Sequence, residues 1–252
     1  MRKILLPFLI VSLGLASCKK EKEDISEINE GYKFMPLEIG KYILYDVDST
    51  YWDGQTGDGV GVPIPTASQV RYSVEDTFRD AGGRLSYRIT VLTRNTTADP
   101  FRPNDVVYAT PTENGVEYSQ KNVTYIKLTF PIAEGKSWNG NAMIPSNDDY
   151  YKEYHSDKWQ YTYANFDKDY DLGIRLFNHT VTVNHIDDQL NDPDTDSTAY
   201  AYRNFSQEVY AYNVGLIYRE RVYWEFQPKV GSSGGSGKRK GYAVRMRAVD
   251  HN

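Results

Sequence analysis

The chain has a single cysteine, Cys18, among its 252 residues, and its only long apolar run lies just before that cysteine. The residues after Cys18 therefore cannot form a disulfide, a cysteine-ligated zinc or iron–sulfur site, or a cysteine nucleophile. The folded part of the chain must draw its stability from a packed core instead.

The sequence also lacks a basic block and a helical pattern. Its 29 basic and 34 acidic residues give a formal charge of −5, and its one basic run, Lys238-Arg239-Lys240, has no interleaved aromatic residue for base stacking. We interpret this run as a solvated loop edge and expect no nucleic-acid partner. No long apolar repeat of 3.6 residues is present, so helices should be scarce.

The N-terminus has the features of an export signal. Arg2 and Lys3 precede an apolar stretch over residues 4–15. About twelve residues rise only about 18 Å as a helix, too little for a hydrocarbon core of about 30 Å, so residues 1–17 are predicted to be a signal peptide. Leu15-Ala16-Ser17-Cys18 resembles the lipobox of bacterial lipoproteins, which implies that Cys18 carries lipid, including palmitate. The alternative is that Cys18 is the small residue of an ordinary cleavage site.

Residues 18–33 are expected to be a lipidated, flexible tether. Between residues 19 and 29 only Ile25 and Ile28 are apolar, too few to build a core. The acidic residues here resemble the signal that exports Bacteroidota lipoproteins to the outer face of the outer membrane, although lysines are interleaved; a solvated spacer is the alternative. We expect a lipid-anchored protein of the outer membrane, either facing the periplasm or on the cell surface.

Residues 34–252 are expected to form one antiparallel β domain. Short alternating segments recur through this region, and the 22 tyrosines suit pleated surfaces. Ala81-Gly82-Gly83 and Asn114-Gly115 separate alternating runs as tight hairpins do, which makes the paired strands antiparallel. The predicted fold is all-β: a single antiparallel sheet, strongly curved or closed into a barrel, with little helix. The predicted strands are 42–48, 69–78, 85–93, 106–109, 116–119, 123–130, 159–166, 174–185, 199–205, 216–226 and 242–249. Residues Gly231 to Gly237, all glycine or serine, are expected to be a flexible hairpin connection.

Together with the lipobox, two short motifs resemble Bacteroidota outer-membrane lipoproteins of unassigned function. They are the opening Pro36-Leu37-Glu38-Ile39-Gly40-Lys41-Tyr42 and the late segment Val214-Gly215-Leu216. The resemblance implies an antiparallel β architecture and a place in the cell envelope. It brings no catalytic residues to this chain.

Three aromatic residues are the candidate ligand-binding residues. Trp159, Tyr161 and Tyr163 alternate along one predicted strand, so they share a face that could stack on a sugar. The alternative, which we favour, is that this face belongs to the core. In addition, Asp-Ser-Thr at Ser49 and at Ser197 resembles the short acceptor sequence for O-glycosylation in the Bacteroidota envelope, and Ser197 is the better candidate because it lies in a predicted loop.

The remaining polar motifs predict no metal site and no cofactor. An even separation should place His179 and His185 on one face of a strand, but six residues span about 20 Å, too far for one ion. Asp192, Asp194 and Asp196 alternate like the start of a calcium loop, yet Ser197 and Arg203 replace its turn glycine and its glutamate.

The leading hypothesis is a non-catalytic cell-envelope lipoprotein that binds a glycan or another small ligand, held to the membrane through its lipid anchor. The first alternative is a structural or accessory subunit of an outer-membrane assembly, with a protein partner in place of the ligand. The second is a hydrolase whose carboxylates assemble from distant strands, since such pairs leave no local motif.

Overall fold

The structure is a computed structural model that describes residues 30–54, 68–145, 149–154, 157–229 and 237–252. The predicted signal peptide, Cys18 and nearly all of the Gly/Ser connection at 231–237 lie outside the described residues. No helix within the described residues has the length and hydropathy of a membrane-spanning segment.

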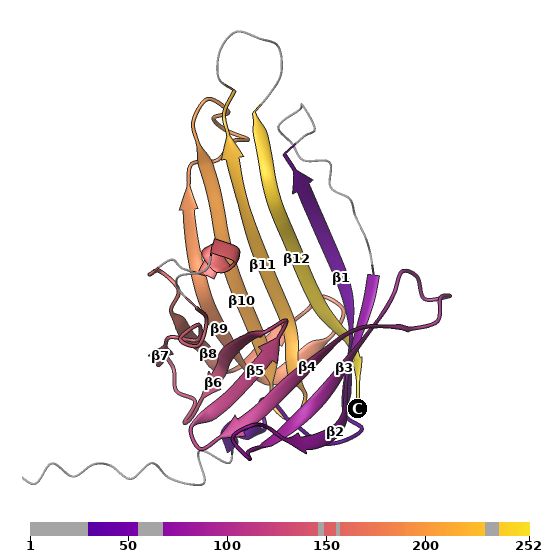
Figure 1. Cartoon of the computed structure of the whole chain (residues 1–252). Coiled ribbons are helices and arrows are strands. Elements are labelled where there is room, and N and C mark those ends of the chain that lie inside the picture. The colour runs from indigo at the N-terminus through magenta and orange to yellow at the C-terminus, as the bar shows by residue number, and fades with distance from the viewer. Residues whose placement is uncertain (1–29, 55–67, 146–148, 155–156, 230–236) are drawn as a thin grey trace, which may run out of the picture.

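The described chain forms one antiparallel sheet of twelve strands, and its only helical element of note is a 3-10 helix, η1, at Asp149–Tyr154 (Figure 1). The predicted all-β class, with a single curved sheet and little helix, is confirmed. The strands are β1 (Tyr42–Asp53), β2 (Ser68–Arg79), β3 (Leu85–Arg94), β4 (Arg102–Thr112), β5 (Gly115–Gln120), β6 (Val123–Thr129), β7 (Ser137–Trp138), β8 (Tyr161–Asp171), β9 (Leu176–Leu190), β10 (Ala201–Ala211), β11 (Gly215–Gln227) and β12 (Lys238–His251).

The order of the strands across the sheet brings its two ends together. It runs β6-β5-β4-β3-β2-β1-β12-β11-β10-β9-β8-β7, so the first and last strands of the chain pair in the middle. At the ends of the sheet, the Ile126 amide of β6 donates to the Gly140 carbonyl at 2.8 Å, and the Trp138 indole of β7 donates to the Ile126 carbonyl at 2.8 Å. These bonds nearly close the sheet into a barrel.

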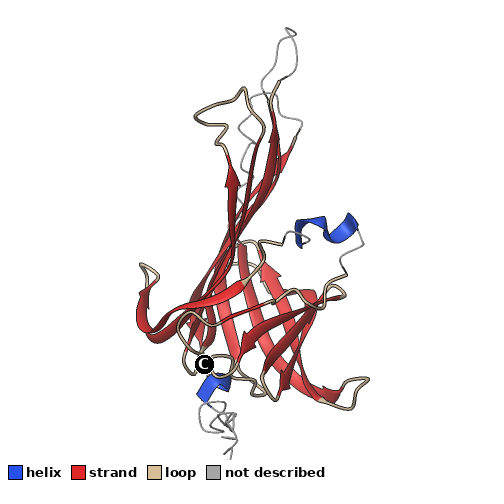
Figure 2. Cartoon of the chain, turned by 90° about the vertical axis from the view of Figure 1, so that its left-hand side faces the viewer, coloured by secondary structure: helices blue, strands red, loops and turns tan. Residues whose placement is uncertain are grey.

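The barrel is uneven because its strands differ in length. Strands β9, β11 and β12 have 13 to 15 residues, whereas β5 and β6 have 6 and 7. The long strands therefore rise beyond the barrel as a twisted extension of one wall, as Figure 2 shows. The barrel proper is the lower part, where all the short strands lie.

Cross-strand register defines the face that lines the barrel. Val47, Met246, Arg219 and Glu208 stand opposite one another across β1, β12, β11 and β10. Residues directly opposite in an antiparallel pair point to the same face, so this row of side chains shares the interior. Two of its four members are charged.

The segment before β1 packs against one end of the barrel. Phe34 is buried and packs edge to face on Tyr212, and Tyr32 packs in the same way on Phe130. Residues 30–33 lie within the range expected to be tether, yet Tyr32 already contacts the domain. The packed part of the chain therefore begins a few residues before the expected start at residue 34.

Two expectations about polar residues were wrong. Arg239 does not belong to a solvated loop edge, because it begins β12 and is buried between the rings of Trp52 (5.4 Å) and Trp224 (4.7 Å). His179 and His185 do not share a face: His179 has a φ of 53° and is exposed, while His185 is buried in the interior. Irregular backbone in β9, including a register shift opposite Ser206, breaks the period of two on which that expectation rested.

Candidate ligand-binding site in the barrel interior

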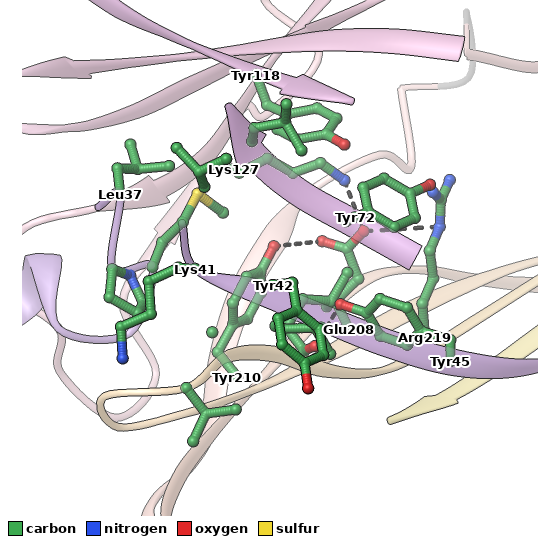
Figure 3. Close-up of a pocket in the computed structure, with 18 of the residues that line it drawn as sticks. Leu37, Lys41, Tyr42, Tyr45, Tyr72, Tyr118, Lys127, Glu208, Tyr210 and Arg219 are labelled. Atoms are coloured by element: carbon green, nitrogen blue, oxygen red, sulfur yellow. Dashed lines mark hydrogen bonds and ion pairs between the residues drawn. The ribbon is translucent and has the colours of Figure 1, made fainter. Parts of the chain in front are cut away.

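A buried carboxylate lies at the centre of the barrel. Glu208 of β10 is 1% exposed and accepts a hydrogen bond of 2.6 Å from the Lys127 ammonium of β6, across the barrel. Arg219 of β11 brings its Nε within 3.7 Å of the same carboxylate oxygen. Two consecutive strands, β10 and β11, and the distant strand β6 thus contribute to one charged cluster, which Figure 3 shows.

The second oxygen of Glu208 has its own partners. The Tyr210 hydroxyl donates to it at 2.7 Å, and the His185 Nε2 lies 3.5 Å away. The His185 ring stacks on Tyr161 with centroids 3.9 Å apart, and its Nδ1 pairs with the Ser206 hydroxyl at 2.9 Å. Glu208 therefore has partners on both oxygens, as a buried carboxylate requires.

The electrostatic surroundings determine the charge state of each group in the cluster. Burial raises the pKa of Glu208, but Lys127, His185 and Arg219 outweigh this effect and hold the pKa well below its usual range, so the carboxylate stays ionised. Burial, aided by the neighbouring cations and opposed by Glu208, lowers the pKa of His185 to about 3, so this imidazole is neutral at pH 7. Burial also lowers the pKa of Lys127, an effect that Glu208 opposes.

A cavity of about 100 Å³ adjoins the cluster. One part of its wall is apolar and comes from the segment before β1, from β2 and from the β10–β11 turn, with Met35, Leu37, Val74, Val214 and Leu216. The other part consists of Lys41, Lys127, Glu208, Arg219 and tyrosines, among them Tyr45, Tyr72, Tyr118 and Tyr210 (Figure 3). A molecule in this cavity would meet an apolar surface on one side and hydroxyl and charged groups on the other.

The candidate ligand-binding aromatic residues, Trp159 just before β8 and Tyr161 and Tyr163 within it, face inward. Trp159, Tyr161 and Tyr163 are 7%, 1% and 1% exposed and belong to the main core cluster. The Trp159 indole donates to the Glu153 carbonyl at 2.9 Å, and the Tyr163 hydroxyl donates to the Thr129 carbonyl at 3.0 Å. These three side chains therefore lie in the core, as the favoured alternative expected. They form no exposed stacking surface for a sugar.

The two candidate glycosylation sites differ in accessibility. Ser197 lies in the exposed connection between β9 and β10, where the carboxylate of Asp196 is held by the hydroxyl and amide of Thr198. Ser49 is half-buried within β1, on the face that continues the barrel interior, opposite Val244. The acceptor hydroxyl is thus more open at Ser197, and modification of either residue stays a prediction.

Sequence reasoning missed Glu208, Lys127 and Arg219. For Lys127 a signal existed, because it lies two positions after Tyr125 on the same strand, and its ammonium lies 5.1 Å from the centre of that ring. For Glu208 the local pattern predicted exposure. Val209 and Ala211 are apolar and alternate along β10, so they predict that the core lies on their face of the strand and that Glu208 lies on the opposite, solvent-facing side. Both faces of this part of β10 are in fact buried.

An open hollow on the outer face of β2 to β5 is a second concave surface. Phe78 and Tyr108 are exposed there and pack edge to face at 5.2 Å. Its charged side chains pair with one another: Arg84 with Asp80 and Glu117, and Arg88 with Asp76. The hollow therefore offers aromatic surface but few unsatisfied polar groups. Among the described residues no three His, Asp or Glu side chains gather in a metal-binding arrangement.

Fold and interior together define a nearly closed β-barrel with a charged, tyrosine-lined centre. No protein-family model matches the chain, and no curated protein matches its sequence. Among solved structures, it resembles a predicted exported protein with a YmcC-like fold from Bacteroides fragilis (TM-score 0.34, 12% identity, 85% of this chain and 98% of that one). It also resembles a predicted lipoprotein from Parabacteroides distasonis (TM-score 0.33, 12% identity, 87% of this chain and 98% of that one). These scores are too low to inform the function of this chain.

Proposed function

We propose that the chain is a non-catalytic cell-envelope lipoprotein that binds a small, partly apolar ligand in the interior of its barrel. The observation that carries the proposal is the cavity beside Glu208, with its apolar wall and its polar wall. Concave, mostly apolar sites with a few converging polar groups are typical of small-molecule binding. The envelope location rests on the signal peptide and the lipobox at Cys18.

The interior is favoured over the outer surface as the binding place. Trp159, Tyr161 and Tyr163 are buried and cannot stack on a glycan in solvent. The outer hollow beside Phe78 holds charged groups that already pair with one another. An assembly subunit would require a continuous apolar patch. The most exposed apolar residues, Ile39, Ile174 and Leu176, instead come from two separate parts of the chain, the segment before β1 and the β8–β9 turn with the start of β9.

A binding role fits the state of the ionisable groups better than a catalytic one. Both oxygens of Glu208 have partners, and its pKa stays low, so it would be a poor general acid or base near neutral pH. His185 is neutral, stacked on Tyr161 and absent from the cavity wall. Glu208 and His185 therefore suit a structural role beside the cavity better than proton transfer to a substrate.

The proposal is tested by filling the cavity. Val74→Phe would place a larger side chain where Val74 of β2 lines the cavity, and Val106→Phe, on the exposed side of β4, is the matched control. Ligand-observed NMR with the full chain should show that butyrate or butyramide binds the parent protein and the control, and that Val74→Phe lowers affinity by about tenfold or more. If neither four-carbon compound binds the parent protein, or if Val74→Phe binds as the control does, the interior is not the binding site.

A further inference from the structure

The barrel centre holds more positive than negative charge. Lys127 and Arg219 share the one carboxylate of Glu208, and His185 is neutral. Of the other ionisable groups nearby, Arg221 has its own partner in Glu153 at 2.9 Å, and Asp105 is partly exposed and bonded to Gln120. A charge without a counter-charge is costly in a poorly solvated interior, so this one would be stabilised by an added anion.

Arg219 is the cation of this cluster that has unused hydrogen-bond donors. The Lys127 ammonium bonds to Glu208 at 2.6 Å, whereas Arg219 approaches that carboxylate only through its Nε, at 3.7 Å. Within the described part of the chain its two terminal nitrogens make no hydrogen bond. The side chain is 31% exposed although its neighbours Lys127 and Glu208 are almost fully buried. Arg219 is also one of the residues that line the cavity.

A hydroxyl stands beside this guanidinium. The Tyr72 hydroxyl and the Arg219 head group act electrostatically on each other, in keeping with their placement in Figure 3, and both residues line the cavity. No hydrogen bond of that hydroxyl is found among the described residues, so it can donate to a bound oxygen. The forked guanidinium matches the two oxygens of a carboxylate, and a neighbouring hydroxyl adds a further donor.

We propose that Arg219, assisted by Tyr72, binds the carboxylate of a short-chain fatty acid whose alkyl chain lies against Met35, Leu37 and Leu216. A monocarboxylate carries one negative charge, which balances the one cation of the barrel centre that lacks a counter-charge. Lys41 also lines the cavity, but its ammonium donates to the Asn252 carbonyl at 3.0 Å. The volume sets the chain length. A cavity of 150 Å³ holds benzene, so about 100 Å³ holds an alkyl chain of about four carbons.

This inference rests on the proposed function, and one comparison separates the two. Butyrate and butyramide have nearly the same size and shape and differ in charge. The full chain, titrated with each and followed by ligand-observed NMR, should bind butyrate at least about tenfold more tightly than butyramide at pH 7. Equal affinities would overturn carboxylate recognition while leaving the binding function intact. Binding of neither would overturn both.

Variants assign the effect to Arg219. Arg219→Gln should reduce the affinity for butyrate to that for butyramide, and Arg219→Lys, which keeps the charge but not the fork, should fall between. The matched control is Arg245→Gln, on the outer face of neighbouring β12, where Arg245 pairs with Glu220 at 2.8 Å. The control should bind both compounds as the parent protein does. An undiminished preference for butyrate in folded Arg219→Gln would overturn the assignment, and if neither variant folds, the comparison in the parent protein still decides it.

Discussion

At the scale of single residues, Glu208 determines how the barrel centre is built. A buried carboxylate that lost a charged partner would leave an uncompensated charge, which typically costs about 3 to 5 kcal/mol. Lys127, Tyr210 and Arg219 come from three strands and meet at this one side chain. The cluster therefore ties β6 to β10 and β11 across the barrel.

His185 should make the protein sensitive to mild acid. Burial lowers its pKa to about 3 in the folded state, and Lys127, Arg219 and Arg221 act in the same direction while Glu208 opposes them. The unfolded chain binds a proton near pH 6.5 and the folded chain does not, so stability is present above pH 6.5 and is lost as pH falls toward 3. Between pH 6.5 and 5 this single group should remove about 2 kcal/mol of the free energy of unfolding.

Urea unfolding of the parent protein and of His185→Gln across this range measures the effect. The variant should lose distinctly less stability than the parent protein between pH 6.5 and 5. The control is His179→Gln. The hydrogen bond that the His179 ring donates to the Asp167 carboxylate raises the pKa of exposed His179, so its contribution to stability has the opposite sign. A parent protein and a His185→Gln variant with parallel pH profiles would contradict the buried, neutral imidazole.

At the scale of elements, Gly241 of β12 allows two tryptophans to approach one arginine. Gly241 stands opposite both Trp52 of β1 and Trp224 of β11, and Arg239 packs between those two rings. Its φ is +145°, and an added Cβ would lie 2.1 Å from the Tyr223 carbonyl oxygen. Both the backbone conformation and the space require glycine at this position.

Gly241→Ala should therefore be far more costly than an ordinary glycine replacement. A Cβ in contact with backbone forces two strands apart, and we expect a loss of about 3 kcal/mol or more in the free energy of unfolding. Gly83→Ala is the matched control, because Gly83 also has a positive φ, +77°, but has open space around it in the β2–β3 turn. The control should lose about 1 to 2 kcal/mol. Equal losses in the two variants, measured by denaturant unfolding, would show that the close approach in β12 relaxes easily.

At the scale of the whole molecule, the lipid anchor predicted at Cys18 is the feature that would place the barrel at a membrane. The apolar stretch before Cys18 is too short to span, and the cysteine follows small residues. Cells fed radiolabelled palmitate should incorporate label into the parent protein and not into Cys18→Ser. The variant should also leave the membrane fraction on washing, and label retained by Cys18→Ser would contradict acylation at this residue.

The sequence by itself determined the class of the fold and most of its strands. Alternation of apolar and polar residues, with glycine turns between, is a local property, so eleven of the twelve strands were predicted from neighbouring residues alone. The strand that was missed, β7, has two residues and exists only through pairing with β8. Strand β4 was predicted too short because Pro103 and Pro111, which cannot donate to a ladder, lie near its ends.

Only the tertiary structure decided where the charged residues of the interior lie. The strand predicted in its region ended at Phe205, because a glutamate between Gln207 and Val209 gives no local sign of burial. Its carboxylate is tolerated in the core since Lys127, 81 positions earlier in the chain, reaches it across the barrel. Likewise, the sequence around Arg239 predicts a solvated residue, whereas in the folded chain the rings of Trp52 and Trp224 pack against it. The free energy of a buried charge depends on the partners that surround it, and strand order brings those partners together from distant parts of the chain.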